Sequence, residues 1–300
     1  MRLEWRFLPP ALRARIEEQL GSSVVTAESR NHGYTPGFAS VLACEDGTRH
    51  FVKAASRSAQ SVFAEAYREE ARKLATLPEA VPAPRLQWVL DDEWVAVGIE
   101  YLDGRHPARP WRADELDASL DALEVIAREL TPPPAALPLA QAAEELGAFL
   151  ECWDAVHVLH PELAPREEAH ELASRFAEVV AGETLVHTDM RDDNTLIDGD
   201  GRVWFCDWNW PCLGASWLDS LFMLIGPRGD GLDVESVIAE RPLLREVPPG
   251  DVDSVIALVT GFFLKSAAGP AVPTSPYLRD FQRWQGEVCW EWLCERRGWA

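Results

Sequence analysis

A short stretch late in the chain gathers residue types that can do chemistry. The segment from His187 to Asn194 reads HxDxxxxN, and a second carboxylate, Asp207, follows where a strand-like run ends. A carboxylate such as that of Asp189 can accept a proton from a hydroxyl group. An amide and another carboxylate supply the hard oxygen ligands that Mg²⁺ prefers. Because a loop joined to a β-hairpin can bring these groups together, we expect Asp189, Asn194 and Asp207 to share one site.

The spacing of these residues matches the catalytic-loop and metal-binding signature of the kinase superfamily. The three fixed positions of the HxDxxxxN pattern would carry little weight alone, because they arise by chance in many chains. The signature implies that Asp189 orients the acceptor hydroxyl and takes its proton, and that Asn194 and Asp207 hold Mg²⁺. His187 is expected to hydrogen-bond the loop backbone rather than to act as an acid or a base.

Two charged residues nearer the N-terminus occur in the order that the signature requires. Lys53 ends the run FVK on a predicted strand, where it would pair with nucleotide phosphates, and Glu70 on the following helix would be its ion-pair partner. The adjacent Glu69 competes for this role. Glu70 has the better register, because it lies four and seven residues before the core-facing Leu74 and Leu77.

The nucleotide is expected to contact two further segments of the N-terminal part. Residues 29–37 form a turn where a loop covering the nucleotide belongs, and Gly33 is the glycine within it that we expect to approach the phosphates. Glu100 and Leu102 end the last predicted strand. There the backbone groups of a hinge would bind the adenine edge, so the assignment rests on position and not on side-chain identity.

The combination resembles the aminoglycoside phosphotransferase and choline kinase family, and within it the actinobacterial-type small-molecule phosphotransferases, over nearly the whole chain. The run DWNWP from Asp207 and the later Asp219 resemble the metal-binding aspartate of that family followed by a structural one. Thr188 stands where the family often has glycine. No activation segment with an APE-like ending fits between Asp207 and Asp219, so a protein substrate is not expected.

The resemblance implies transfer of the γ-phosphoryl group of Mg²⁺-bound ATP or GTP to a hydroxyl of a small molecule. Arg191 would neutralise the transferring group, with a plain surface arginine as the alternative. An aminoglycoside-like antibiotic, and with it a role in antibiotic resistance, is the leading expectation for the acceptor. A kinase of a metabolite such as choline, homoserine or a sugar is an alternative. A catalytically inactive nucleotide-binding module is a further one.

Acceptor-binding residues are expected in two places. Trp208 and Trp210, beside the metal-binding aspartate, would border a ligand. A single helix is predicted over residues 277–299, and acidic residues form a stripe along it at 100° per residue. The stripe comprises Asp280, Glu287, Glu291 and Glu295, and Trp284 lies among them. In the resembling family, carboxylates of late helices bind the amino groups of the substrate. Such acidic rows are also common as solvated helix faces, and that alternative stays open.

The elements that position these residues fall into two groups. The first is a set of strands with one helix; the strands are predicted at 24–29, 38–44, 49–55, 85–90 and 93–102, and the helix at 60–77. Helices dominate afterwards, at 113–130, 139–159, 166–180 and from about 217 onward, with a β-rich insertion at 184–207. We therefore expect an α+β, two-lobe protein-kinase-like fold. Residues 1–101 would form a nucleotide-binding lobe with a five-stranded antiparallel sheet, and residues 102–300 a mostly helical lobe with the catalytic loop, metal site and acceptor pocket.

The composition indicates which classes of binding partner to expect. A formal net charge of -21 over 300 residues disfavours nucleic acid and anionic membranes and favours a cationic acceptor, although acidity also serves solubility alone. Six scattered cysteines without a CxxC pair predict reduced thiols rather than a zinc site. The first residues contain no signal-like apolar run, so a cytoplasmic location is expected. The protein is expected to be a monomer or a homodimer.

Overall fold

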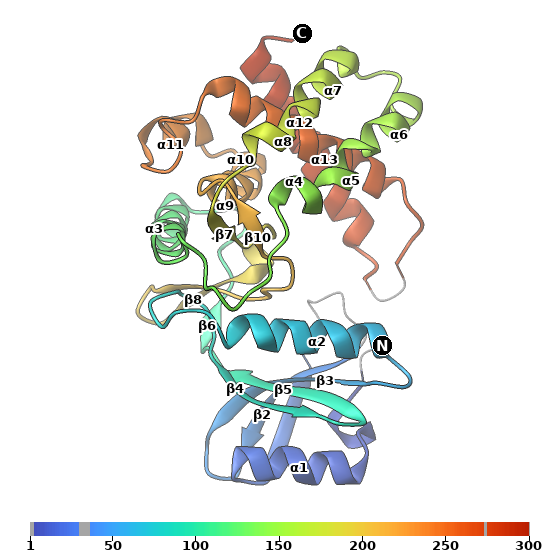
Figure 1. Ribbon diagram of the computed structural model, residues 1–300, viewed down its shortest axis with the longest axis vertical. Helices are drawn as coiled ribbons and strands as arrows, with labels where there is room; N and C mark the ends of the chain where they lie inside the picture. Colours follow the sequence, from blue (N-terminus) through green and yellow to red (C-terminus); the bar gives the residue numbers. More distant parts are fainter. Residues whose placement is uncertain (1–2, 30–36, 273–274, 300) are drawn as a thin grey trace.

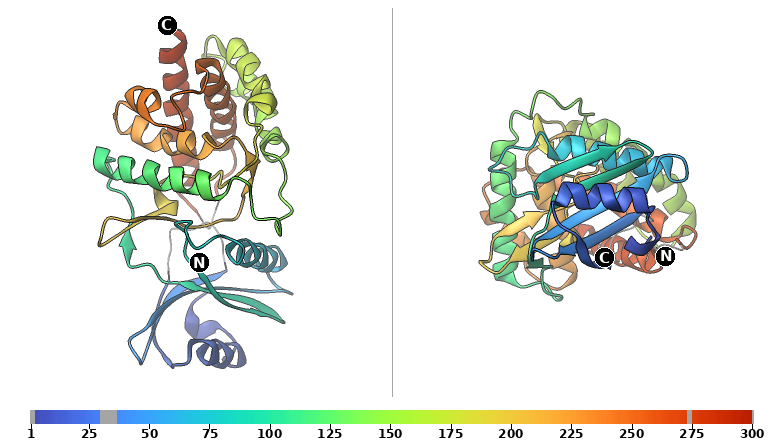
Figure 2. Two further views of the ribbon diagram at one scale, coloured as in Figure 1. Left: turned by 60° about the vertical axis from the view of Figure 1, so that its left-hand side comes forward. Right: turned by 90° about the horizontal axis from the view of Figure 1, so that it is seen from below.

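The computed structural model of the chain describes residues 3–29, 37–272 and 275–299. It has two lobes, one built around a β-sheet and one built mainly of helices (Figure 1). Figure 2 shows the same division from two further sides. The expected α+β two-lobe fold is confirmed. The predicted nucleotide-covering loop, including Gly33, lies outside the described residues.

Five antiparallel strands form the sheet of the N-terminal lobe, in the order β1-β2-β3-β5-β4. They are β1 (Val24–Ser29), β2 (Phe38–Cys44), β3 (Arg49–Ser56), β4 (Leu86–Asp91) and β5 (Trp94–Glu100). Because β3 is the central strand, Lys53 is paired on both sides, opposite Ala39 of β2 and Val97 of β5. Pairing on both edges fixes the backbone from which the Lys53 side chain extends.

A helix packs on each face of this sheet (Figure 1). The predicted helix is α2 (Ser61–Leu74), which lies on the face of the sheet toward the other lobe. It buries Tyr67, Ala71 and Leu74. The second, α1 (Pro10–Leu20), covers the opposite face, a correction to the single helix expected. Its buried Leu12, Ile16 and Leu20 recur every fourth residue, which is the spacing of one helix face.

The chain enters the second lobe directly after β5. The short strand β6 (Gly104–Arg105) pairs with β8 (Thr195–Asp198), which in turn pairs with β9 (Val203–Phe205). A separate pair joins β7 (Thr184–Val186) to β10 (Cys212–Gly214). The predicted β-rich insertion is therefore divided between two small sheets, and we interpret residues 101–103 as the connection between the lobes.

Helices make up most of the C-terminal lobe, including a one-turn 3-10 helix, η2 (Asp192–Asn194), in the catalytic loop. They are α3 (Ala113–Glu129), α4 (Ala142–Glu145), α5 (Gly147–Leu150), α6 (Cys152–Leu159), α7 (Arg166–Ser174), α8 (Phe176–Val179), α9 (Leu218–Met223), α10 (Ile225–Gly229), α11 (Val234–Glu240), α12 (Pro249–Ala267) and α13 (Leu278–Arg297). The helix predicted over residues 139–159 is broken into α4, α5 and α6.

Helix α12 is the centre of the C-terminal lobe. Most of its side chains from Val252 to Gly261 are buried, and it packs against α13, α7 and α6. A helix that is apolar on nearly every side needs partners all around it. In the part of the chain that the structure describes, no helix has both the length and the apolar character needed to cross a membrane.

Candidate active site

The predicted catalytic loop between β7 and β8 is held by one buried carboxylate. Asp219, near the start of α9, accepts the backbone N–H of His187 at 2.7 Å and that of Thr188 at 2.8 Å. The His187 ring is fully buried, and its Nε2 lies 2.9 Å from the carbonyl oxygen of Cys206. His187 thus hydrogen-bonds the backbone, as predicted.

Thr188 adopts a left-handed backbone conformation, with φ at 67°. This conformation is unusual for a β-branched residue and natural for glycine, which explains why glycine suits this position. The Thr188 hydroxyl donates to the carbonyl oxygen of Trp210 at 2.8 Å. The hydrogen bond to Trp210 and the one from the Thr188 N–H to Asp219 oppose the strain of the conformation.

The side chain of Asp189 lies between two other polar groups of the loop. The amide nitrogen of Asn194 donates to the carbonyl oxygen of Asp189 at 2.8 Å and to its Oδ2 at 2.9 Å. Arg191 lies 3.5 Å from Oδ1 of the same carboxylate and 2.6 Å from Asp193. Burial raises the pKa of Asp193, and the charge of Arg191 counteracts this. Asn194 therefore holds Oδ2 of Asp189 in place, while Oδ1 of the same carboxylate faces Arg191.

Lys53 connects the two lobes through a pair of carboxylates. Its ammonium lies 2.7 Å from Glu70 of α2 and 3.1 Å from Asp207, which follows β9. Burial opposes the charge of Lys53, but both carboxylates outweigh it and raise the lysine pKa. Burial alone would raise the pKa of Asp207, yet Lys53 outweighs this effect and lowers that pKa. The neighbouring Glu69 pairs instead with Arg72 at 2.6 Å, so the lysine contact falls to Glu70.

A cavity of about 400 Å³ opens between the lobes around this pair. The predicted nucleotide and metal residues lie along it: Lys53, Glu70, Glu100, Leu102, Asn194 and Asp207. Apolar side chains from both lobes form the rest of its walls, among them Val41, Phe51, Ile99 and Leu196. A cavity with both apolar walls and charged groups suits a nucleotide base and its phosphates.

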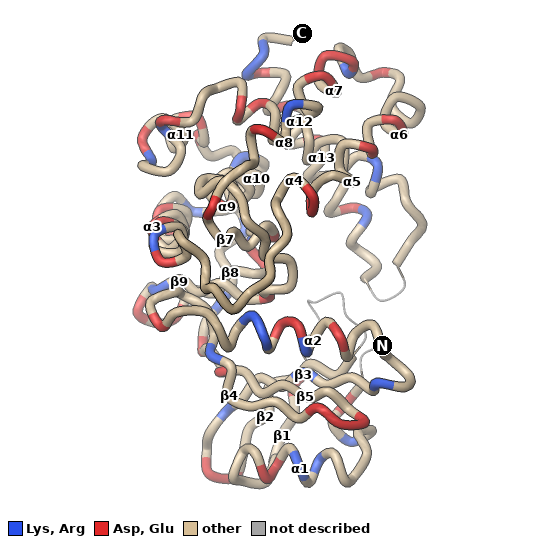
Figure 3. The backbone as a smooth tube through the Cα atoms, in the orientation of Figure 1, with Lys and Arg blue, Asp and Glu red and all other residues tan. Residues whose placement is uncertain are grey.

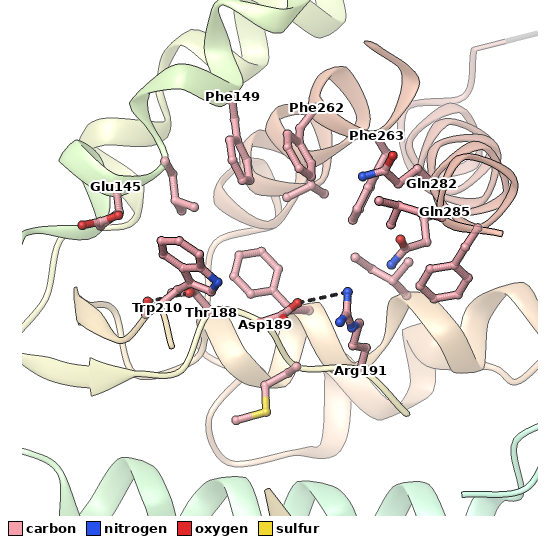
Figure 4. A pocket seen from close by; sticks show the side chains of 17 residues that line it. Glu145, Phe149, Thr188, Asp189, Arg191, Trp210, Phe262, Phe263, Gln282 and Gln285 are labelled. Atoms are coloured by element: carbon pink, nitrogen blue, oxygen red, sulfur yellow. Dashed lines mark hydrogen bonds and ion pairs between the residues drawn. The ribbon is translucent and has the colours of Figure 1, made fainter. Parts of the chain in front are cut away.

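A second cavity of about 400 Å³ lies in the C-terminal lobe beside Asp189 (Figure 4). Asp189 and Arg191 form one side of it, and Phe149, Phe262 and Phe263 face them across the opening (Figure 4). Arg191 lines both cavities. The two cavities therefore adjoin at the arginine, with Asp189 on one side and the metal-binding candidates on the other.

Trp208, predicted to border the acceptor, is a core residue. Its side chain is fully buried, its indole N–H donates to the carbonyl oxygen of Phe205 at 2.9 Å, and the ring of His187 packs edge-on against it at 4.7 Å. Trp210 is 65% exposed and lines the second cavity. The sequence places both tryptophans next to the metal site, and only packing decides which of them is accessible.

The acidic stripe on α13 also lies away from the cavity. The residues of α13 that line it are Leu278, Phe281, Gln282 and Gln285. Glu287 and Glu291 are exposed, and at 100° per residue they project from the opposite side of the helix. Trp284 stacks on Phe281 and lies 5.2 Å from the guanidinium of Arg109 without lining the cavity. The alternative of a solvated face therefore describes Glu287 and Glu291.

Sequence reasoning missed most of the residues around the second cavity. Phe149, Phe262 and Phe263 read as ordinary core positions of helical segments, and Gln282 and Gln285 carry no motif. The available signal was weak: the Phe262-Phe263 pair and Gln285 fall among apolar residues of two helices that pack on each other. Without the pairing of α12 and α13, the sequence does not reveal a shared cavity.

The residues at the lobe interface fit a magnesium ion. In the described ranges, no three or more His, Cys, Asp or Glu side chains cluster as a metal site. Mg²⁺ does not require such a cluster, because it is commonly held by one or two carboxylates together with substrate phosphates. Asp207 and Asn194 line the same cavity. The described hydrogen bonds of the Asn194 side chain use its nitrogen, so its amide oxygen is left for a cation.

Comparisons with known proteins agree with this arrangement. Residues 37–240 match the model of the phosphotransferase enzyme family (APH). A search of the curated proteins finds no match to the chain. One similar solved structure is an aminoglycoside phosphotransferase from Alicyclobacillus acidocaldarius subsp. acidocaldarius DSM 446, with 14% identity, a TM-score of 0.59 and 92% of each chain covered.

Two further solved structures are similar over most of their length. The choline kinase LicA from Streptococcus pneumoniae has 13% identity and a TM-score of 0.62, covering 97% of this chain and 98% of that one. The spectinomycin phosphotransferase APH(9)-Ia, crystallised with ADP and spectinomycin, has 12% identity and a TM-score of 0.65, covering 93% of this chain and 96% of that one. At sequence identities this low, the similarity is evidence for a shared fold and for nothing more.

The two-lobe fold, with a paired lysine and two adjoining cavities, defines the class of protein as kinase-like. The match over residues 37–240 goes further. This chain belongs to the phosphotransferase enzyme family, whose members transfer phosphate to hydroxyl groups of small molecules.

Proposed function

We propose that this enzyme transfers the γ-phosphoryl group of Mg²⁺-bound ATP or GTP to a hydroxyl of a small molecule held in the cavity beside Asp189. The observation that carries the proposal is the position of Arg191, which lines both cavities. A phosphoryl group that passes from one cavity to the other must pass this guanidinium, and its negative charge needs a cation there.

The cavity between the lobes would bind the nucleotide. Lys53, held by Glu70, points a cation at the position of the phosphates, and the apolar walls would enclose the base. In the described residues the backbone N–H of Leu102 has no hydrogen-bond partner, which leaves it available to an acceptor on the base. ADP in the spectinomycin phosphotransferase structure supports the choice of ligand.

Asn194 and Asp207 would hold Mg²⁺ in this cavity. When bound, the ion would neutralise charge on the nucleotide phosphates. Burial of Asp207 works against its charge, but Lys53 outweighs burial and lowers the pKa, so the carboxylate is ready to accept a cation at neutral pH. Two hydrogen bonds from Asn194 to Asp189 join this metal-binding candidate to the proposed base.

Asp189 would orient the acceptor hydroxyl and take its proton. The hydroxyl oxygen forms a bond to the γ-phosphorus as the bond from that phosphorus to the bridging oxygen breaks, and the nucleoside diphosphate leaves. The hydroxyl proton passes to the Asp189 carboxylate late in the transfer. Arg191, 3.5 Å from this carboxylate, would stabilise the charge spread over the transferred group.

An aminoglycoside-like antibiotic is one candidate acceptor, and choline, homoserine or a sugar is another. The choice among them depends on the chemistry of the cavity beside Asp189. A catalytically inactive nucleotide-binding module is the alternative from another class. The carboxylate of Asp189, which lines the second cavity and not the one between the lobes, speaks against it, because a module that only binds nucleotide has no need of this separate site.

Nucleotide turnover tests the proposal directly. We expect the purified protein to release ADP from ATP, or GDP from GTP, when Mg²⁺ and a hydroxylated acceptor are both present, and the Asp189→Asn variant not to do so. A wild type that binds nucleotide but never releases diphosphate with any of a broad set of hydroxylated acceptors would instead be an inactive binding module.

A further inference from the structure

We propose that the acceptor is a hydroxylated molecule with a large apolar surface that carries no charge or a single amine, and not a polycation such as an aminoglycoside. This inference rests on the proposed phosphotransfer function. It concerns the cavity beside Asp189 and follows from the chemistry of its walls.

Aromatic side chains dominate these walls. Six of them line the cavity: Phe149, Trp210, Phe222, Phe262, Phe263 and Phe281. Phe149 of α5 and Phe262 of α12 stack on each other with ring centroids 3.9 Å apart, and together they form an apolar side of the cavity across from Asp189 (Figure 4). Such a surface gains free energy by covering apolar ligand atoms, at roughly 25 cal/mol per Å² removed from water.

The two polar side chains that α13 contributes to the cavity, Gln282 and Gln285, are neutral. Gln285 of α13 is only 7% exposed, lines the cavity, and makes no hydrogen bond to any described residue. Gln282, one turn away, accepts a hydrogen bond from Arg279 at 2.8 Å. A buried amide without a protein partner suits a hydroxyl or carbonyl group of a ligand, because an unpaired polar group in such a place costs free energy.

Carboxylates are scarce in this cavity. Glu145 and Asp189 are the two among the lining residues, and Arg191 lies 3.5 Å from Asp189. Glu145 is exposed, on α4, so it can meet one ammonium group. Further ammonium groups of a polycation would lie against phenyl rings and lose their hydration without a paired charge, which is costly. A single amine could also gain from the faces of the aromatic rings.

The acidity of the whole chain does not supply the missing carboxylates. Acidic residues are distributed over both lobes (Figure 3). Glu287 and Glu291 project from the side of α13 that faces away from the cavity. The net charge of -21 would attract any cation at long range, but selection happens at the walls that touch the ligand.

Three hydroxylated probes separate the possibilities. Chloramphenicol is neutral and aromatic, propranolol is aromatic with one amine, and kanamycin carries several amines. Calorimetry on the protein loaded with Mg²⁺ and a non-hydrolysable nucleotide should show binding of chloramphenicol or propranolol, little changed by added salt, and none of kanamycin. Tighter binding of kanamycin than of both aromatic probes, or no binding of either aromatic probe, would overturn the inference.

Variants locate the binding and supply the control. Phe262→Ala should weaken binding of the aromatic probe by about tenfold or more, because it removes a stacked wall residue. Glu145→Gln should weaken the binding of propranolol and leave the binding of chloramphenicol unchanged. The control is the double variant Glu287→Gln with Glu291→Gln, which should leave the affinities for both aromatic probes unchanged. Weaker probe binding in this control, with no effect of Phe262→Ala, contradicts the inference. Binding of an aromatic probe without diphosphate release by the wild type would instead refute the proposed phosphotransfer while the acceptor class stands.

Discussion

The backbone N–H of Thr188 lies 2.8 Å from Oδ1 of Asp219, a buried carboxylate 31 residues further along the chain. The other oxygen of the same carboxylate accepts the N–H of His187. One side chain of α9 therefore holds the backbone N–H groups of the two residues that precede Asp189. This contact sets the direction in which the loop presents its proposed catalytic carboxylate.

Asp219→Asn should destabilise this loop. An amide side chain has one accepting oxygen, so one of the two buried N–H groups would face a donor and remain unpaired, at a cost of about 1–3 kcal/mol. We expect a lower unfolding temperature and a lower kcat, with little change in nucleotide affinity. Thermal unfolding and steady-state kinetics measure both. A matched exposed change, Glu287→Gln, should alter neither, and an Asn variant as stable as the wild type would contradict the role.

Thr188→Gly and Thr188→Ala form a second matched pair. Both remove the hydroxyl that donates to Trp210, worth about 1 kcal/mol. Glycine also relieves the left-handed strain of about 1–2 kcal/mol, whereas alanine keeps it. Denaturant unfolding should therefore find the glycine variant more stable than the alanine variant. The reverse order would mean that the conformation of residue 188 carries no strain.

Asp189→Asn should lower phosphotransfer by at least about a hundredfold while nucleotide binding survives, because the residue acts on the acceptor side. Its backbone contact with Asn194 is retained in this variant, so the loop should stay folded. Diphosphate release and calorimetry with Mg²⁺-nucleotide separate the two effects. Retention of more than about a third of the wild-type turnover would exclude Asp189 as the base.

Asp207→Ala should abolish metal-dependent nucleotide binding, since it leaves Mg²⁺ without an anionic protein ligand. Despite burial, Lys53 lowers the pKa of Asp207 below its ordinary value of about 4, so the carboxylate is charged above that pH and is protonated only as the pH falls through the lowered pKa. Wild-type affinity for Mg²⁺-nucleotide should therefore hold from about pH 8 to about pH 5. An Ala variant with unchanged affinity would remove Asp207 from the metal site.

Glu70→Gln and Glu69→Gln test the partner of the lysine. Glu70 holds Lys53 at 2.7 Å, whereas Glu69 pairs with Arg72 on the helix surface. A glutamine in place of Glu70 cannot neutralise the ammonium, so we expect the KM for nucleotide to rise by about tenfold, while Glu69→Gln leaves it unchanged. Steady-state kinetics with the nucleotide varied gives both values. Equal effects of the two substitutions would contradict the assigned pairing.

The sequence by itself determined which residues make up the proposed nucleotide side of the site. Lys53, Glu70, Asn194 and Asp207 are recognisable because their spacing along the chain is fixed by single elements, a central strand, one helix and one loop with its hairpin. The strand bounds 24–29 and 38–44 follow equally from local β-branched and aromatic residues and from turn residues. Local patterns of this kind depend on the backbone within an element and need no knowledge of distant partners.

Only the tertiary structure decided the proposed acceptor side. Helix α13 was expected almost as it is observed, yet the face that lines the cavity carries Gln282 and Gln285, and Glu287 and Glu291 lie on the other. That choice follows from packing: α13 lies against α12 and buries Val288 and Trp292, and this burial fixes the rotation of the helix. The aromatic wall likewise unites Phe149 and Phe262, more than a hundred residues apart, through contacts that have no trace in local spacing. Burial of side chains between distant helices, which no single segment encodes, therefore decides what this enzyme can accept.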